Sequence, residues 1–267
     1  MSIKTERRDR TLVVRLDRPE ALNALDPESM ITLNAVMREF RDDAELLVAV
    51  ITGTGDQAFC TGADLKRTLP PETSFAESYF QSYRDSVEAG HYVRALTLSE
   101  LNIPKPMIAA VNGHALGGGA EIALDCDIRI AGQTATFGLP EARWGSVPAV
   151  GGVSKILRAV PRAVAMQMLL TGDRIDATEA HRIGLVSEVV APAKLLDRAL
   201  EIAGRIAGNG PLAVRSIKTL ATRTEDLPLS RSIELEQLLW GVLRDTDDRV
   251  EGRTAFAERR APNYQGR

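Results

Sequence analysis

The sequence predicts an α/β fold that is followed by a helical C-terminal region. Short apolar runs at 11–16, 47–51 and 107–111 have the length and composition of buried strands. The segment 26–40 has apolar positions at helical spacing, and it begins with a capping aspartate followed by proline. Strand, helix and strand in this order predict a right-handed crossover. From residue 193 onward the pattern is helical almost to the end of the chain.

The same criteria predict the rest of the α/β part. Its further elements are strands at 127–131, 134–137 and 185–190 and helices at 151–158, 161–170 and 176–184. Residues 67–102 form a polar insert, with a loop at Pro70-Pro71 and helical spacing from 75 to 101.

Four helices are predicted in the C-terminal region. They are expected at 193–207, 211–223, 230–245 and 247–260. Their apolar faces are too extensive for a solvated tail, so they must pack on the core or on another subunit. We therefore divide the chain into an α/β core at 1–195 and a helical region at 196–267.

Composition and charge narrow the class of protein. The 267 residues carry a formal net charge of −3, which argues against nucleic acid as the main partner. Cys60 and Cys126 are too few for a disulfide framework and suit a reducing compartment. The first residues lack the apolar core of a signal peptide, and no run of about 18 apolar residues predicts a membrane span. We therefore expect a cytoplasmic protein with no membrane partner.

The stretch from Ile108 to Glu121 is the most informative part of the sequence. A predicted strand leads to three glycines, Gly117 to Gly119, and then to a short apolar helix. Glycines let a backbone approach a bulky group, and the first N–H groups of a helix attract an anion or a developing oxyanion. A tight strand-to-helix connection explains the same glycines, and the helix dipole alone favours a glutamate there. The spacing matches neither a Rossmann fingerprint nor a P-loop.

Glu141 is a second candidate carboxylate. It follows Glu121 by 20 residues, and two short strands are predicted between them. This distance allows the chain to return and present both carboxylates to one cavity. A turn carboxylate that follows Pro140 is the simpler interpretation of the residue when it is taken alone.

Other chemistries find little support in the sequence. Residues 58–66 place small side chains around Gly62, which indicates a backbone site, although a loop into a helix capped by Asp64 is the simpler interpretation. Cys60 is more often a packed side chain than a nucleophile, and His114 beside a strand end is more often structural. No Cys-x-x-Cys or His-x-x-x-His spacing predicts a metal site, and no Gly-x-Ser-x-Gly elbow predicts a serine hydrolase.

Six segments taken together resemble the crotonase (enoyl-CoA hydratase/isomerase) superfamily. Each match is weak alone, but their order along nearly the whole chain is specific for the superfamily. The matching segments are 18–25 (RPEALNAL), 58–66 (AFCTGADLK), 106–121 (PMIAAVNGHALGGGAE), 137–141 (FGLPE), 170–174 (LTGDR) and 251–260 (EGRTAFAERR).

This resemblance implies a crotonase-like spiral of ββα units with a helical C-terminal region, usually assembled as homotrimers or homohexamers. The core at 1–195 would bind an acyl-CoA thioester, and the region 196–267 would serve oligomerisation or cover the site as a lid. Coenzyme A is then part of the substrate, and the resemblance implies no separate cofactor and no metal.

The resemblance also implies a catalytic site. The backbone N–H groups of Ala63 and Gly118 would form an oxyanion hole for the thioester oxygen, where each donor contributes about 3 kcal/mol. Hydratases of the superfamily use two glutamates, and both matching positions hold glutamate here. We expect Glu121 to activate water for attack at Cβ and Glu141 to deliver a proton to Cα, with interchangeable roles in a concerted step. Burial must raise at least one of the two pKa values for both forms to coexist near neutral pH.

Substrate binding follows from the same resemblance. The CoA path would be lined by Ala63, Asp64, Leu65, Lys66 and Gly118. Lys66 would meet a CoA phosphate. Arg18, Arg259 and Arg260 are weaker phosphate candidates, and solvated surface charge is the simpler interpretation of each.

Several alternatives remain open at this stage. The superfamily contains Δ3,Δ2-enoyl-CoA isomerases, which often keep a single glutamate, and dehydratases of functionalised acyl-CoA molecules that resemble carnitinyl-CoA. A non-catalytic crotonase-fold protein that binds acyl-CoA or RNA belongs to a different class. The intact glutamate pair argues against a loss of chemistry, and the negative net charge argues against RNA.

Two departures from the family pattern concern the acyl group. Ala149-Val150 stand where the family commonly has Gly-Ala, which adds bulk near Glu141. The insert 67–102 is longer than in short-chain hydratases by roughly ten residues, an estimate by comparison. Both changes touch the expected acyl pocket and allow a branched, aromatic or otherwise unusual enoyl group.

Overall fold

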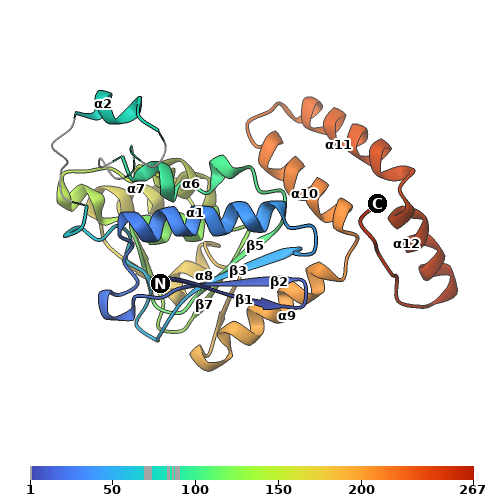
Figure 1. Ribbon diagram of the computed structural model, residues 1–267, viewed down its shortest axis with the longest axis horizontal. Coiled ribbons are helices and arrows are strands. Elements are labelled where there is room, and N and C mark those ends of the chain that lie inside the picture. The colour runs from blue at the N-terminus through green and yellow to red at the C-terminus, as the bar shows by residue number, and fades with distance from the viewer. Residues whose placement is uncertain (1, 69–73, 83–84, 86, 88–90) are drawn as a thin grey trace.

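The larger of two sheets forms the centre of the computed structural model, which describes residues 2–68, 74–82, 85, 87 and 91–267 (Figure 1). This six-stranded sheet has the order β1-β2-β3-β5-β7-β10. Strand β1 forms an antiparallel hairpin with β2, and the other neighbours are parallel. The strands span Ile3–Arg8 (β1), Thr11–Leu16 (β2), Val48–Gly53 (β3), Met107–Val111 (β5), Ile128–Gly132 (β7) and Glu188–Val190 (β10).

A smaller sheet of four strands has the order β4-β6-β8-β9. Its strands span Ala58–Cys60 (β4), His114–Leu116 (β6), Thr136–Gly138 (β8) and Ile175–Asp176 (β9). The pairs β3–β4, β5–β6 and β7–β8 each send their first strand to the larger sheet and their second to the smaller one, and helical residues follow. This repetition confirms the predicted spiral of ββα units.

Helices cover both faces of the larger sheet. Helix α1 (Pro27–Asp42) packs on one face and α9 (Leu195–Ala207) on the other (Figure 1). Within β3, Ala49 and Ile51 belong to the cluster with α1, whereas Val48 and Val50 belong to the cluster with α9. Because both faces of the strand are buried, the strand is an uninterrupted apolar run rather than an alternating one.

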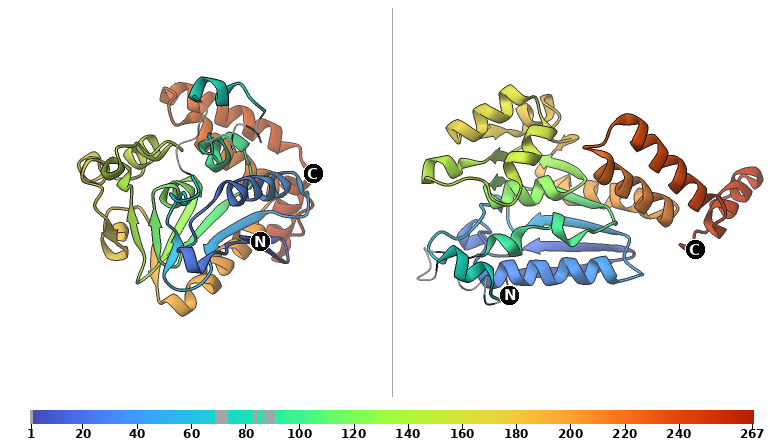
Figure 2. Two further views of the ribbon diagram at one scale, coloured as in Figure 1. Left: turned by 60° about the vertical axis from the view of Figure 1, so that its left-hand side comes forward. Right: turned by 90° about the horizontal axis from the view of Figure 1, so that it is seen from above.

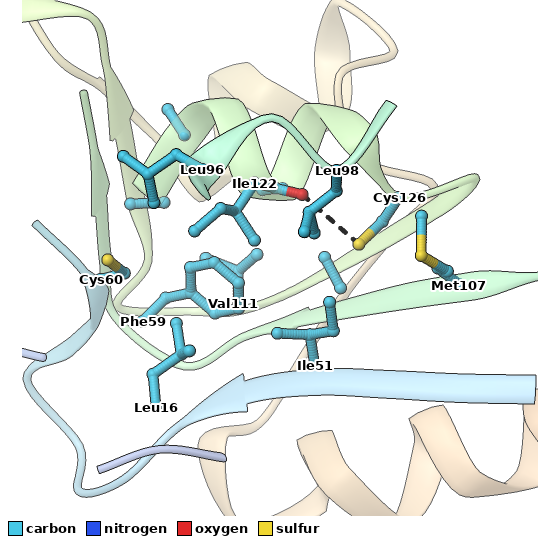
Figure 3. Close-up of a cluster of buried hydrophobic side chains, with 14 of the residues drawn as sticks. Leu16, Ile51, Phe59, Cys60, Leu96, Leu98, Met107, Val111, Ile122 and Cys126 are labelled. Carbon is cyan, nitrogen blue, oxygen red and sulfur yellow. Dashed lines mark hydrogen bonds between the residues drawn. The ribbon is translucent and has the colours of Figure 1, made fainter. Parts of the chain in front are cut away.

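The core beneath α5 (Gly118–Asp125) joins the two sheets. Ile122 points from this helix toward Val111 of β5 and Phe59 of β4, and Leu96 lies in the same cluster (Figure 3). Since the helix packs on a strand of each sheet, close packing fixes its position relative to both.

The last three helices form an arm that extends away from the core (Figures 1 and 2). They are α10 (Pro211–Thr224), α11 (Leu229–Arg244) and α12 (Asp247–Glu258). The arm carries large apolar side chains that are more than half exposed, among them Ile217, Leu229, Leu238, Trp240 and Phe256. The predicted boundary at 195/196 thus falls at the start of α9, which packs on the sheet, whereas the arm contacts the core through α10, where Lys218 pairs with Asp127 at 2.8 Å.

The other helices are short. They are α2 (Phe75–Tyr79), α4 (Val93–Leu96), α6 (Gly152–Ala159), α7 (Arg162–Thr171) and α8 (Ala177–Arg182), with 3₁₀ turns at Pro19–Ala21 (η1), Ser99–Leu101 (η2), Pro140–Trp144 (η3) and Pro192–Lys194 (η4). Every helix in the described part of the chain is too short or too polar to cross a lipid bilayer.

Most predicted elements are confirmed, and the exceptions have physical reasons. Helix α1 begins as predicted, because the Asp26 side chain accepts a hydrogen bond from Ser29 N at 2.9 Å. Strand β1 was not predicted, since it lies at the edge of the sheet and buries only Ile3. Strands β4 and β6 have three residues each, too few for a detectable alternation.

Two predictions about the segment after β4 are wrong. The helix expected to begin at Asp64 is replaced by turns, in which Arg67 N and Thr68 N donate to the Asp64 carbonyl. The helical spacing from 75 to 101 does not produce one helix, because α2, α4 and η2 are separate elements. The loop predicted at Pro70-Pro71 lies outside the described residues.

Substitution of Gly119 by alanine should destabilise the fold. A Cβ at Gly119 would overlap the carbonyl oxygen of Cys60 and lie 2.6 Å from the carbonyl carbon, so α5 would have to move away from β4. We expect a loss of roughly 1–3 kcal/mol in the free energy of unfolding, measured from the urea midpoint.

The matched control is Gly204→Ala in α9, where an added Cβ meets nothing within 4 Å. Alanine should stabilise this helix by about 0.5–1 kcal/mol relative to glycine. Urea midpoints that move by the same amount in the same direction for both variants would show that close contact with Cys60 does not hold α5 in place.

Candidate active site

Ala63 lies just after β4, in a loop that pairs with a distant segment of the chain. Leu25 N–H donates to the Gly62 carbonyl at 2.8 Å, and Asp64 N–H donates to the Leu25 carbonyl at 2.9 Å. Leu25 and Ala63 thereby form a parallel bridge. The bridge uses the N–H groups of Leu25 and Asp64, and the Ala63 N–H takes no part in it.

Gly118 is the first residue of α5, so its N–H has no partner inside the helix. A Cβ on Gly62 would lie 2.9 Å from Gly118 N, and a Cβ on Gly118 would lie 3.9 Å from Ala63 N. The two loops therefore touch through backbone atoms. Gly62 is required for this contact, because its φ of +87° also lies in the left-handed region that favours glycine.

An ion pair between Arg18 and Asp64 holds the loop that contains Ala63. Arg18 Nη2 lies 3.0 Å from Asp64 Oδ2, and Arg18 Nη1 donates to the Ala24 carbonyl at 2.7 Å. Both charged side chains are largely buried, with 16% and 15% of their surface exposed. Arg18 and Asp64 therefore form a largely buried ion pair. This position fits neither of the interpretations made for Arg18, a phosphate-binding residue or a solvated surface charge.

Glu121 projects from the first turn of α5 and is 2% exposed. Its Oε1 accepts hydrogen bonds from Val150 N and Gly152 N, each at 2.8 Å. Burial raises the pKa of Glu121 above its usual value, and these two hydrogen bonds to the charged form oppose the shift. Val150 and Gly152 bind Glu121 through backbone N–H groups, so their side chains gave no reason to predict them as site residues. The Gly151-Gly152 pair is the one feature of the sequence that could have indicated this turn.

Glu141 lies in η3, directly after β8, and approaches the glycine loop. Its Oε1 would be 3.0 Å from a Cβ built on Gly117. Among the described residues, its Oε2 is buried and has no hydrogen-bond partner. Burial raises the pKa of Glu141 to about 7, and the nearby Glu121 carboxylate adds to the increase. The two glutamates therefore differ in the form that their surroundings favour. Backbone N–H groups stabilise the carboxylate of Glu121, whereas burial favours the protonated form of Glu141.

One cavity of about 410 Å³ brings the predicted groups together. Ala63, Gly118, Glu121 and Glu141 all line it, as the sequence led us to expect. Its walls are largely apolar, and they include Leu65, Tyr92, Val93, Leu96, Trp144, Val147, Ala149 and Val150. Ala149 and Val150, where the sequence departs from the family pattern, thus lie in the same cavity as the glutamates.

The other candidate binding residues lie outside the cavity lining. Lys66 is exposed beside the loop of Ala63, a position that keeps its expected role in phosphate binding open. Arg259 and Arg260 directly follow α12, which is the last helix of the arm. Arg260 forms an ion pair with Glu251 at 2.6 Å.

The structure also locates Cys60 and His114, for which the sequence favoured a packing or structural role. Cys60 is fully buried, and burial raises the pKa of its thiol to about 12, which makes it a poor nucleophile. His114 Nδ1 lies 2.8 Å from Thr136 Oγ1 in a contact between β6 and β8. The described residues contain no cluster of three or more histidine, cysteine, aspartate or glutamate side chains suited to a metal ion.

Comparison with known proteins shows which family the chain resembles. The family model for enoyl-CoA hydratase/isomerase matches residues 6–267. The (E)-benzylidenesuccinyl-CoA hydratase of Thauera aromatica is 46% identical over 266 residues, which cover 100% of both chains. The carnitinyl-CoA dehydratase of Proteus mirabilis is 39% identical over 272 residues, which cover 100% of this chain and 99% of the relative.

The fold agrees with a solved structure over its full length. The enoyl-CoA hydratase of Bacillus anthracis matches with a TM-score of 0.89 and 33% sequence identity, over 100% of each chain. The sequence motifs, the spiral of ββα units and these relatives lead to one assignment. The chain belongs to the enoyl-CoA hydratase/isomerase family, within the crotonase superfamily.

Proposed function

We propose that this protein is a hydro-lyase that adds water reversibly across the 2,3 double bond of an enoyl-CoA thioester. The observation that carries the proposal is one cavity lined by the buried Glu121, the partly buried Glu141 and the residues Ala63 and Gly118. Relatives that act as a hydratase and a dehydratase on CoA thioesters support the same class of reaction.

The oxyanion hole supplies the electrostatic part of the mechanism. Water attack at Cβ moves negative charge onto the thioester oxygen, and the Ala63 and Gly118 N–H groups donate to that oxygen. Gly118 stands at the N-terminus of α5, where the helix dipole also favours negative charge. Both donors are held in place before the substrate binds, so little reorganisation is needed as the charge develops.

The two glutamates divide the proton transfers. Glu121 takes the role of the base, because two N–H groups favour its charged form, which can accept a proton, and fix its orientation. It accepts a proton from the water that attacks Cβ. Glu141 is the better acid, because its pKa of about 7 leaves a large protonated fraction at neutral pH. Glu141 donates its own carboxyl proton to Cα, and dehydration follows the reverse course.

A bulky or aromatic acyl group is the second element of the proposal. Tyr92 and Trp144 line the cavity together with several aliphatic side chains, and aromatic walls favour flat apolar groups. The relative from Thauera aromatica is named for a benzylidene-substituted substrate, which supports this preference. Lys66, exposed beside Ala63, would bind a phosphate of the CoA moiety.

Replacing either glutamate by glutamine should remove acid–base catalysis without removing the binding site. We expect Glu121→Gln and Glu141→Gln each to lower kcat by at least about 10²-fold, with CoA affinity almost unchanged. The assay follows loss of the conjugated thioester absorbance on a panel of straight-chain and aryl-substituted 2-enoyl-CoA substrates. Glu45→Gln is the control, because Glu45 is exposed in the turn before β3 and does not line the cavity.

Three other results of this assay would contradict the proposed reaction. Full activity of Glu141→Gln would exclude the two-glutamate mechanism. Turnover of 3-enoyl-CoA alone, with only one glutamate required, would identify an isomerase. Tight binding of CoA without turnover of any substrate would identify a binding protein.

The pH dependence of kcat/KM should report Glu141. Because Glu141 must be protonated to donate a proton, kcat/KM should fall as the pH rises through about 7. The residual activity of Glu141→Gln should lack this decrease. A wild-type profile that stays flat from pH 6 to roughly pH 9 would contradict the assignment of Glu141 as the acid.

Unfolding experiments check the same shift without turnover. The pKa of Glu141 is raised in the folded state, so its contribution to stability is present below the usual value of 4.5 and is lost as the pH rises through about 7. Glu141→Gln should therefore unfold at a higher temperature than the wild type above neutral pH, and this advantage should vanish in acid.

The exposed apolar side chains of the arm lead us to propose a homotrimer or homohexamer. Light scattering should give a mass three or six times the 29.0 kDa of the chain. Phe256→Asp should lower that mass, because Phe256 of α12 is 88% exposed in the single chain. Phe80→Asp, which alters a phenylalanine that is 86% exposed outside the arm, should leave the mass unchanged. A monomeric wild type would exclude the proposed assembly.

A further inference from the structure

A buried ion pair lies behind Glu121, at the other end of α5. Asp125 follows Glu121 by one helical turn, so the two side chains lie on the same face of the helix. The Asp125 carboxylate pairs with the ammonium group of Lys155 in α6 and accepts a hydrogen bond from Ser99. The side chains of Asp125 and Lys155 are 2% and 23% exposed.

Lys155 makes a second contact that leads back to the catalytic cavity. Its Nζ donates to the Val150 carbonyl at 3.1 Å, and Val150 N donates to Glu121 Oε1 at 2.8 Å. The Lys155 side chain folds back over Gly151, where an added Cβ would lie 2.9 Å from Cε. A closed chain of contacts thus runs from Glu121 through Val150 and Lys155 to Asp125, and it begins and ends on α5.

We propose that Lys155, held by Asp125, is a positioning residue that fixes the Val150–Gly152 turn against Glu121 and supplies a positive charge close to that carboxylate. This inference rests on the proposed role of Glu121 as the base that activates water. Two amides can orient a carboxylate only while the turn that carries them is held. Lys155 binds the Val150 carbonyl, which belongs to the peptide unit between the two donating amides.

The charges around Glu121 predict the direction of the effect. Lys155 lowers the pKa of Glu121, whereas Asp125 raises it, and the Glu141 carboxyl faces Glu121 across the cavity. Asp125 is the last residue of α5, where the helix dipole disfavours a carboxylate, and burial raises the pKa of Asp125 as well. Loss of Lys155 alone would therefore leave two buried carboxylates one turn apart without a cation, and Glu121 would hold its proton more tightly.

A purely structural role is the competing explanation, since the ion pair also joins α5 to α6. The two explanations differ in what happens to Glu121. A structural link affects global stability and leaves the titration of Glu121 unchanged. A positioning residue changes that titration, and it changes kcat more than KM.

The experiment titrates Glu121 directly in protein labelled with ¹³C at the glutamate carboxyl carbon. The Glu121 signal is assigned from its absence in Glu121→Gln. In Lys155→Met we expect the titration midpoint of Glu121 to move to higher pH. With the preferred enoyl-CoA at pH 7, kcat should fall roughly 10- to 100-fold while KM changes little.

Two further variants serve as rescue and control. The double variant Asp125→Asn/Lys155→Met removes both neighbouring charges, so the Glu121 midpoint should return toward the wild-type value. Its kcat should stay low, because the Val150 carbonyl remains unheld. Arg158→Met breaks an ion pair that the same helix makes with Asp226 at 3.0 Å. Neither residue lines the cavity, so this variant should change neither quantity.

The outcomes separate this inference from the proposed function. An unchanged Glu121 midpoint in folded Lys155→Met would overturn the inference, and so would wild-type kcat in the double variant if the single variant does not fold. The NMR titration needs no turnover, so a shifted midpoint in a protein without hydratase activity would uphold the electrostatic link and reject the proposed reaction.

Discussion

Backbone contact between the start of α5 and the end of β4 is the constraint on which the site depends. Gly119 leaves no room for a Cβ against Cys60, and Gly62 brings its own backbone against Gly118. At this separation Ala63 and Gly118 line the same cavity. The glycines therefore set the distance between β4 and α5. Ordering glycine backbone costs chain entropy, and the packing of Ile122 against both sheets offsets this cost (Figure 3).

The spiral of ββα units explains how distant segments reach one cavity. Strands β4, β6 and β8 are neighbours in the smaller sheet, and each is followed by a candidate group, Ala63, Gly118 and Glu141. Because parallel strands end at the same edge, three successive units deliver these groups to one place. The link between Arg18 and Asp64 then ties the first of these loops to a segment 46 residues earlier in the chain.

Burial of several carboxyl groups in one region is the main electrostatic cost of the site. The structure offsets it differently for each group. Two amides stabilise Glu121, protonation relieves Glu141, and Lys155 neutralises Asp125. A base and an acid can therefore coexist near neutral pH in one apolar cavity, a division that two solvent-exposed glutamates with equal pKa values would not achieve.

Elements with a local signal could be predicted from the sequence. Strands buried on both faces, the capped start of α1 and the family motifs around Glu121 and Glu141 are all visible in short windows of the chain. The edge strand β1, the three-residue strands β4 and β6 and the engagement of Arg18 with Asp64 were not. The contacts of the Val150 and Gly152 amides with Glu121, and of the Lys155 ammonium with Asp125, became visible only in the folded structure. They join backbone and side-chain atoms about 30 residues apart, which no local periodicity records.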